Sequence, residues 1–198
     1  ILVSHRLIPP AMKLLVEMED LSLNGFIAPG HVSTIIGLEP YRIFPMRYGV
    51  PTVVAGFEPL DVLFGVYMIL KQLNDGNPLL ENEYVRAVHW EGNVKAKKLM
   101  QRFFAVVDGR WRGLGTIPAS KFKLRNEYAA CDAHLKYGVK VEHGVDLQPG
   151  CRCHLVIIGK IKPTECPLFM KACTPQKPVG ACMVSSEGTC RIWAKTNQ

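Results

Sequence analysis

The chemically richest feature of this chain is a group of cysteines near its C-terminus. Of seven cysteines in 198 residues, six fall within the last 48. They are Cys151, Cys153, Cys166, Cys173, Cys182 and Cys190. Clustered thiols can form disulfides, bind metal as thiolates, or exchange electrons as a dithiol pair. The C-terminal segment is therefore the first candidate for a functional site.

Three kinds of chemistry fit these six cysteines, and the spacing of the cysteines discriminates between the three only in part. Disulfides are typical of secreted domains, whereas the preceding region resembles an intracellular fold and carries one cysteine. Zinc sites usually pair ligands across about two to four residues, but here the close pair is C-x-C and later gaps are 12, 6, 8 and 7 residues. An iron–sulfur cluster with four thiolate ligands plus a separate dithiol would use all six. The two thiols of C-x-C point in different directions in an extended chain, which suits one ligand and one free thiol.

The formal net charge of +7 does not indicate a nucleic-acid partner. Lysines and arginines are scattered, with no dense run and no basic stripe interleaved with aromatic residues. Part of the excess is local, because residues 151–198 hold seven basic and two acidic residues, a net charge of +5 with protonated thiols. Thiolates bound to metal would offset much of it. We therefore expect no nucleic-acid partner.

The hydropathy pattern predicts no membrane span, and we expect a cytoplasmic protein with no membrane partner. The longest apolar run, Val62 to Leu70, is far shorter than the roughly 20 residues that cross a bilayer. The chain begins at Ile1, and Ile1 to Ser4 resembles a strand more than a signal peptide. We therefore expect the chain to be a piece of a longer protein.

The region before the cysteines alternates short strands with helices, which is typical of parallel βαβ units. Proline and glycine mark the helix starts and turns. The expected strands are Ile1–Ser4, Gly25–Ala28, Thr52–Ala55 and Glu83–Val88. Helices are expected from Pro9 to Met18, His31 to Ile36, Pro59 to Leu73, Ala96 to Phe104 and Asn126 to Tyr137, with a loop from Gly109 to Pro118.

This pattern predicts an α/β protein in two parts. Residues 1–142 would form a Rossmann-like βαβ domain with a parallel sheet, and residues 143–198 a small cysteine-rich iron–sulfur domain. The second part is rich in proline and glycine and has little apolar material for a core. Such a segment needs a metal or disulfides to hold it together.

Several segments resemble the HypD family of hydrogenase maturation proteins. In the cysteine-rich part these are P-G-C-R-C from Pro149, K-P-T-E-C-P-L-F from Lys162, K-A-C-T-P from Lys171 and P-V-G-A-C-M-V-S-S-E-G-T-C from Pro178. Upstream they are H-R-L-I-P-P-A-M from His5, G-F-I-A-P-G-H-V-S-T-I-I-G from Gly25, V-V-A-G-F-E-P-L-D from Val53 and W-R-G-L-G from Trp111. The resemblance covers essentially the whole chain.

The resemblance implies a 4Fe-4S cluster in a small domain similar to ferredoxin-thioredoxin reductase. Carried over by position, the cluster ligands are Cys151, Cys166, Cys173 and Cys190. The same correspondence makes Cys153 and Cys182 a redox dithiol beside the cluster. Glu187, near the end of the last motif, is a candidate proton donor to the dithiol, with an ordinary turn carboxylate as the alternative.

The function implied is that of a nickel–iron hydrogenase maturation factor, an accessory protein in metallocentre assembly. It would be a redox scaffold for the Fe(CN)2CO centre, with HypC and HypE as partners and the cluster and dithiol supplying electrons. The family's C-G-T-H and G-P-G-C-P-V-C motifs do not occur here. We therefore expect the transient Fe(CN)2CO iron to be held mainly by a missing N-terminal region. A protein disulfide reductase and a structural zinc domain remain as alternatives.

Four other residues are of interest. His5, His31 and Glu58 each follow an expected strand, where open α/β sheets bind ligands, although His31 and Glu58 could simply cap helices. Cys131 lies apart from the other cysteines, and we expect it to be a small buried hydrophobic residue.

Overall fold

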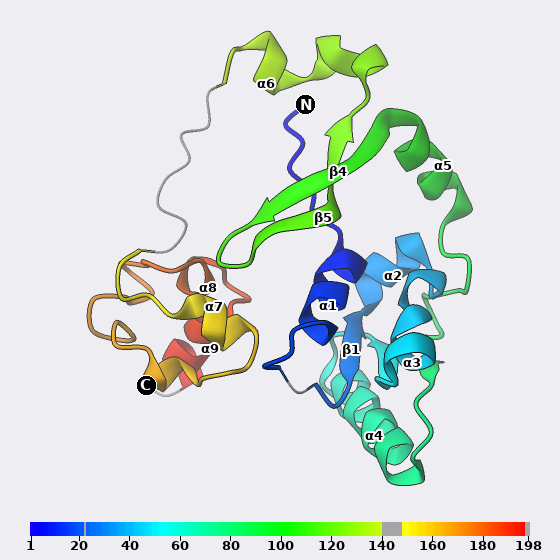
Figure 1. Ribbon diagram of the computed structural model, residues 1–198, viewed down its shortest axis with the longest axis vertical. Helices are drawn as coiled ribbons and strands as arrows, with labels where there is room; N and C mark the ends of the chain where they lie inside the picture. The colour runs from blue at the N-terminus through cyan, green and yellow to red at the C-terminus, as the bar shows by residue number, and fades with distance from the viewer. Residues whose placement is uncertain (22, 140–147, 197–198) are drawn as a thin grey trace.

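The computed structural model describes residues 1–21, 23–139 and 148–196 (Figure 1). It is a mixed α/β structure whose first part is built on a three-stranded parallel sheet. The cysteine-bearing helices gather in a separate lobe (Figure 1). The predicted boundary between residues 142 and 143 lies outside the described residues.

The sheet consists of β1 (Phe26–Pro29), β2 (Thr52–Ala55) and β3 (Leu80–Asn82), in that order. Phe26 is in register with Thr52, and Thr52 with Leu80. All four residues of β2 are buried, as expected for the central strand of a parallel sheet covered on both faces. The strands predicted at Gly25–Ala28 and Thr52–Ala55 are thus confirmed.

Two predicted strands are wrong. Ile1–Ser4 does not join a sheet; the Ile1 amino group instead donates to the Cys131 carbonyl oxygen at 2.7 Å. The third strand covers residues 80–82 and has ended before the predicted segment begins at Glu83. There the backbone turns, and the N–H groups of Glu83 and Tyr84 both donate to the Val54 carbonyl oxygen.

The helices around the sheet follow the proline signals. They are α1 (Ile8–Val16), α2 (Gly30–Ile36), the 3-10 turn η1 (Glu39–Tyr41), α3 (Ile43–Tyr48) and α4 (Pro59–Asp75). Pro59 opens α4 at its first position, where its missing N–H costs nothing. Gly76 ends the helix in the left-handed conformation, at φ 62°. Tyr41 and Phe44 are fully buried and belong to the core beside the sheet.

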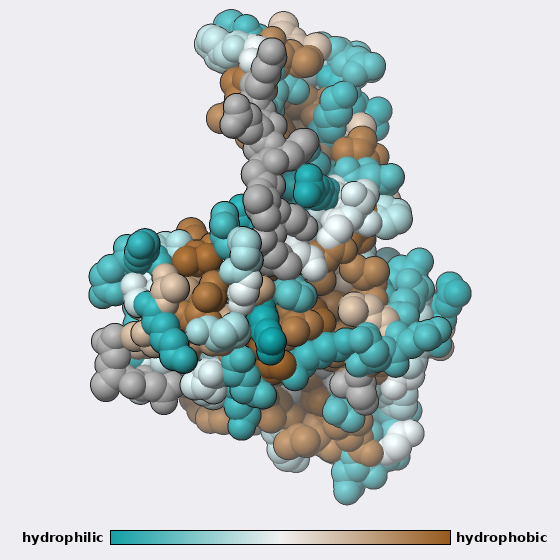
Figure 2. Space-filling model, turned by 60° about the vertical axis from the view of Figure 1, so that its left-hand side comes forward, coloured by the Kyte–Doolittle hydropathy of each residue, from teal (hydrophilic) through white to brown (hydrophobic). Residues whose placement is uncertain are grey.

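Helix α4 has an unusual distribution of side chains. Its buried residues are Asp61, Gly65 and Gln72, and the Gln72 amide donates to Glu81 and accepts from the Leu79 N–H. The opposite face is apolar and exposed, at Leu60, Leu63, Phe64, Tyr67 and Leu70. Figure 2 shows hydrophobic surface at the lower end of the molecule, at the level that α4 occupies in Figure 1. Helix α4 is therefore held to the sheet by polar pairs and close approach at Gly65.

An antiparallel hairpin follows α5 (Val94–Phe103). Asn93 caps α5 by accepting a hydrogen bond from the Ala96 N–H. The hairpin strands are β4 (Phe104–Trp111) and β5 (Gly115–Leu124), with a bulge between Val107 and Gly109. They replace the loop predicted at residues 109–118. The predicted helix from Asn126 to Tyr137 is split into η2 (Asn126–Cys131) and α6 (Ala133–Lys136).

The C-terminal lobe contains only short elements. These are α7 (Cys153–Ile157), the 3-10 turn η3 (Pro163–Glu165), α8 (Ala181–Val184) and α9 (Thr189–Thr196). Lys160 and Asp20 form an ion pair that connects this lobe to the first part of the chain. Among the described helices, none combines the length and the apolarity needed to cross a bilayer.

Candidate functional site

All six C-terminal cysteines are buried, and the structure brings them together. The beginnings of α7, α8 and α9 carry Cys153, Cys182 and Cys190, whereas the other three lie in the turns between elements. Each cysteine is between 3% and 8% exposed. Five of the eight residues in the buried core cluster of this lobe are cysteines, and the other three are Val156, Met183 and Ala194. Thiols therefore make up most of this small core.

Five of the six cysteines line one small cavity, together with Leu168, Phe169, Gly180 and Met183. The lining cysteines are Cys151, Cys153, Cys166, Cys173 and Cys190. The cavity measures about 10 Å³, room for about one water molecule. It is too small for an organic substrate, so its chemistry is that of the thiols themselves.

Backbone hydrogen bonds fix several sulfur atoms. The Cys182 sulfur accepts from the Cys190 N–H at 3.2 Å, and the Cys173 sulfur accepts from the Val179 N–H at 3.3 Å. Hydrogen bonds from the N–H groups of Ala181 and Cys182 also reach the Cys153 sulfur. Cys153 therefore lies against the backbone of Cys182, its predicted redox partner, although Cys182 is outside the cavity lining.

Burial raises the pKa of two of these thiols, Cys153 and Cys190. Desolvation, followed by interaction with Cys151, raises the pKa of Cys153 to about 11. Desolvation and the neighbouring Cys182 raise the pKa of Cys190 as well. A bound metal cation has the opposite effect because it stabilises thiolate. In residues 1–21, 23–139 and 148–196, no group of three or more His, Cys, Asp or Glu side chains is arranged to hold a single metal ion.

Two other predicted positions lie away from the cavity. Glu187 is exposed in the turn between α8 and α9, where its N–H donates to the Ser185 hydroxyl. Cys131 is exposed, which contradicts the expectation that it is buried. Arg191, which follows a predicted ligand, was not predicted from the sequence. Its guanidinium donates to the carbonyl oxygens of Pro175 and Met183, and thus ties α9 to the rest of the lobe.

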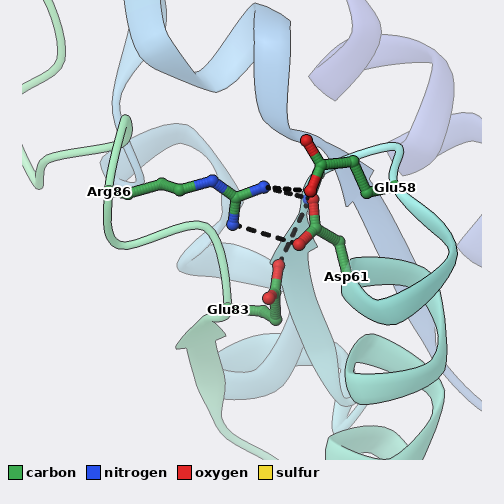
Figure 3. Close-up of polar contacts among 5 residues, drawn as sticks. Glu58, Asp61, Glu83 and Arg86 are labelled. Atoms are coloured by element: carbon green, nitrogen blue, oxygen red, sulfur yellow. Dashed lines mark hydrogen bonds and ion pairs between the residues drawn. The ribbon is translucent and has the colours of Figure 1, made fainter.

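A second polar cluster lies at the carboxyl ends of β2 and β3 (Figure 3). Arg86 donates to both carboxylate oxygens of buried Asp61, at 3.0 and 2.7 Å, and to exposed Glu58 at 3.2 Å. The Gly56 N–H donates to Glu83 at 3.3 Å. A Cβ atom on Gly56 would lie 1.9 Å from an Asp61 oxygen. This cluster joins α4 to the segment after β3, and neither Asp61 nor Arg86 was predicted.

Asp61→Asn is expected to lower the melting temperature at neutral pH. The hydrogen bonds from Arg86 hold the pKa of Asp61 below its ordinary value. A carboxyl whose folded pKa is depressed stabilises the fold above its unfolded pKa of about 3.9, and this stabilisation is lost as pH falls through the folded pKa. The variant should therefore lose less stability than the unsubstituted protein between about pH 4 and pH 2. Calorimetry across this range measures both effects.

Glu58→Gln is the matched control, because Glu58 pairs with the same guanidinium from an exposed position. An exposed ion pair adds little to stability, so this variant should melt close to the unsubstituted protein. Equal destabilisation by the two substitutions would contradict a special contribution from the buried carboxylate.

The two histidines that were predicted to lie at the sheet edge each contact an aromatic ring. The His31 ring packs against Phe57 at 5.0 Å, and the His5 ring meets Phe104 edge-on at 6.1 Å. Glu58 occupies the position before α4, but its side chain does not cap the helix and instead pairs with Arg86. Neither His31 nor Glu58 lines the cysteine cavity.

Comparison with known proteins gives one consistent family. The profile of HypD, described as "Hydrogenase formation hypA family", matches residues 1–197. The hydrogenase expression/formation protein HupD of Azotobacter chroococcum is 43% identical over 196 residues, covering 96% of this chain and 52% of that protein. The hydrogenase maturation factor HypD of Azotobacter vinelandii is 42% identical with the same coverage.

A third relative, hydrogenase maturation factor HypD2 of Bradyrhizobium diazoefficiens, is 43% identical over 194 residues, covering 94% of this chain and 51% of that protein. The chain thus spans about half the length of these curated relatives. The profile match over nearly the whole chain confirms the resemblance found in its cysteine motifs. The chain belongs to the HypD family of hydrogenase maturation factors.

Proposed function

We propose that this chain is part of a redox scaffold for assembly of the Fe(CN)2CO centre of nickel–iron hydrogenases. One observation carries the proposal: six buried thiols gather in one lobe of a chain of the HypD family, and five of them belong to the hydrophobic core of that lobe. Buried thiols without a metal or a disulfide would be a weak core for a segment with so few other apolar residues. Metal binding would give this core its stability.

The donor chemistry of the lobe fits a 4Fe-4S cluster. The proposed ligands Cys151, Cys166, Cys173 and Cys190 all line the same cavity. Each thiolate of such a cluster bonds a different iron, so the ligands surround a space and need not converge on one point. Uptake of the cluster would release the thiol protons. When bound, the cluster would supply one-electron transfer.

Cys153 and Cys182 are the proposed redox dithiol. Hydrogen bonds from the backbone at Ala181 and Cys182 hold the Cys153 sulfur near its partner residue. Oxidation of the two thiols to a disulfide would release two electrons and two protons. Two electrons from a low-potential one-electron donor protein, taken up with two protons, would restore the thiols. Glu187 is proposed as a carboxylate that accepts and returns one proton, from the turn after the helix that carries Cys182.

The Fe(CN)2CO unit would be cargo, and the proposed partners are the maturation proteins HypC and HypE. We place the holding of the cargo iron mainly outside this chain, because the six cysteines of the C-terminal lobe are assigned to the cluster and the dithiol and the seventh, Cys131, lies apart from them. The raised pKa of Cys153 disfavours the alternative of a protein disulfide reductase in the metal-free state, since thiolate is the attacking species. A cytoplasmic setting would keep the dithiol reducible.

Metal analysis of anaerobically purified protein tests the proposal. We expect about four irons and four sulfides per chain, with a broad visible absorption band that dithionite bleaches. One zinc per chain without colour would instead support a structural zinc domain. Three disulfides without metal would contradict both metal sites.

A further inference from the structure

A second candidate site, separate from the cysteine cavity, is a groove lined by apolar residues from α1, α2, α5 and the hairpin. One cavity of about 620 Å³ includes His5, Arg6 and His31 in its lining. A second cavity of about 340 Å³ adjoins it and includes Lys97 and Arg125. The two cavities share Ile36, Pro40, Met100, Phe104 and Phe122. Together they make one groove with an apolar floor.

The floor of this groove is the apolar side of α5 and the hairpin, which the rest of the chain leaves partly uncovered. None of the residues of α5 is buried, and its Met100 lines both cavities. In the hairpin, Val106 is 52% exposed and lines the second cavity. Phe104 and Phe122 pack against each other at 5.4 Å and present a rigid aromatic surface.

The rim of the groove is positively charged. Arg6, Lys97 and Arg125 each donate to backbone carbonyl oxygens, of Arg110, Glu91 and Gln101 respectively. These contacts hold the side chains without neutralising their charge. Glu39 is the one acidic residue among those lining the two cavities.

The elements that carry the rim, α5 and the hairpin, add further positive charge around the groove. We call them the wall of the groove. Residues 94–124, which form α5 and the hairpin, contain eight lysines and arginines against one aspartate. Their net charge of +7 equals that of the whole chain. A partner that approached this wall would be steered by its charge before it met the apolar floor.

We propose that the groove binds a segment of a protein partner that carries apolar side chains flanked by carboxylates. Two adjoining cavities that share an apolar lining suit an amphipathic helix or an extended segment better than a compact small molecule. The apolar side chains of the segment would cover Met100, Phe104 and Phe122, and its carboxylates would face Lys97 and Arg125. This proposal uses none of the cysteines, so its failure would leave the proposed redox function standing.

Binding of a labelled peptide to the full chain, measured by fluorescence anisotropy, tests the proposal. The probe is a fluorescein-labelled peptide of about 14 residues, roughly four helical turns, with leucines on one face and glutamates elsewhere. The double variant Lys97→Glu with Arg125→Glu should weaken binding about tenfold or more, because repulsion replaces attraction at the rim. Lys95→Glu with Lys98→Glu makes the same change in net charge away from the cavity lining, and should weaken binding less than about threefold.

Three further results would overturn the proposal. The first is the absence of peptide binding by the unsubstituted chain, and the second is equal weakening by the two double variants. The third is equal or tighter binding of a control probe. The control probes are a leucine–lysine peptide, a glutamate peptide with serine in place of leucine, and a single-stranded oligonucleotide.

Discussion

Cys166→Ser protein, purified without oxygen, is expected to hold less than about one iron per chain, against about four in the unsubstituted protein. Cys166 is buried and lines the cavity, and the hydroxyl oxygen of serine is a much harder ligand than a thiolate. Because metal binding contributes directly to the stability of a lobe with so small a core, the variant should also melt at lower temperature. Iron and sulfide analysis with a melting curve measures both losses.

Cys153→Ser is the matched comparison, since it removes another buried thiol from the same lobe. This variant should retain the iron and lose the reversible oxidation of two thiols, which counting of free thiols before and after mild oxidation would show. Because Cys153 and Cys166 both line the cavity, a difference in iron content between the two variants cannot be explained by location in the cavity alone. Loss of iron in both variants would show that the division of the six cysteines into ligands and dithiol is wrong.

The presence of a thiol site could be predicted from the sequence because its residue types are unusual and close together. The fold then adds what spacing cannot supply. Residues 153 and 182 are far apart in the chain, and only the packing of α7 beside α8 brings the Cys153 sulfur to the Cys182 backbone. Glu187 lies next to this site in the sequence, but its exposed position in a turn could not be foreseen.

Elements bounded by proline and glycine were the most predictable part of the fold. Strands β1 and β2 and helix α4 all lie where expected. The hairpin was missed because the segment around Gly113 and Gly115 has the composition of a loop, and these glycines in fact make the left-handed turn between two strands, with φ near 80°. The Asp61–Arg86 pair was missed because an acidic residue in an apolar helix gives no signal of a partner 25 residues away.

Gly180→Ala is expected to lower the iron content to less than half and to destabilise the lobe by about 1–3 kcal/mol, the usual range for overpacking. A Cβ atom at this position would lie 2.6 Å from the Cys151 sulfur and 3.2 Å from the Cys153 Cβ. The backbone at Gly180, with φ −90° and ψ 151°, is open to any residue. The penalty would therefore come from displacement of the thiols and not from backbone strain. Iron analysis and denaturant unfolding measure the two effects.

Ser186→Ala controls for substitution in the same segment, because Ser186 is exposed and lies outside the cavity lining. It should keep the iron content and the unfolding midpoint of the unsubstituted protein. Gly188→Ala distinguishes a loss of stability from displacement of a cluster ligand. Its added Cβ would lie 2.1 Å from the Cys182 carbonyl oxygen, and neither Gly188 nor Cys182 lines the cavity. Full iron content in Gly180→Ala would mean that the sulfur of Cys151 can move freely, which a ligand fixed in a bound cluster cannot do.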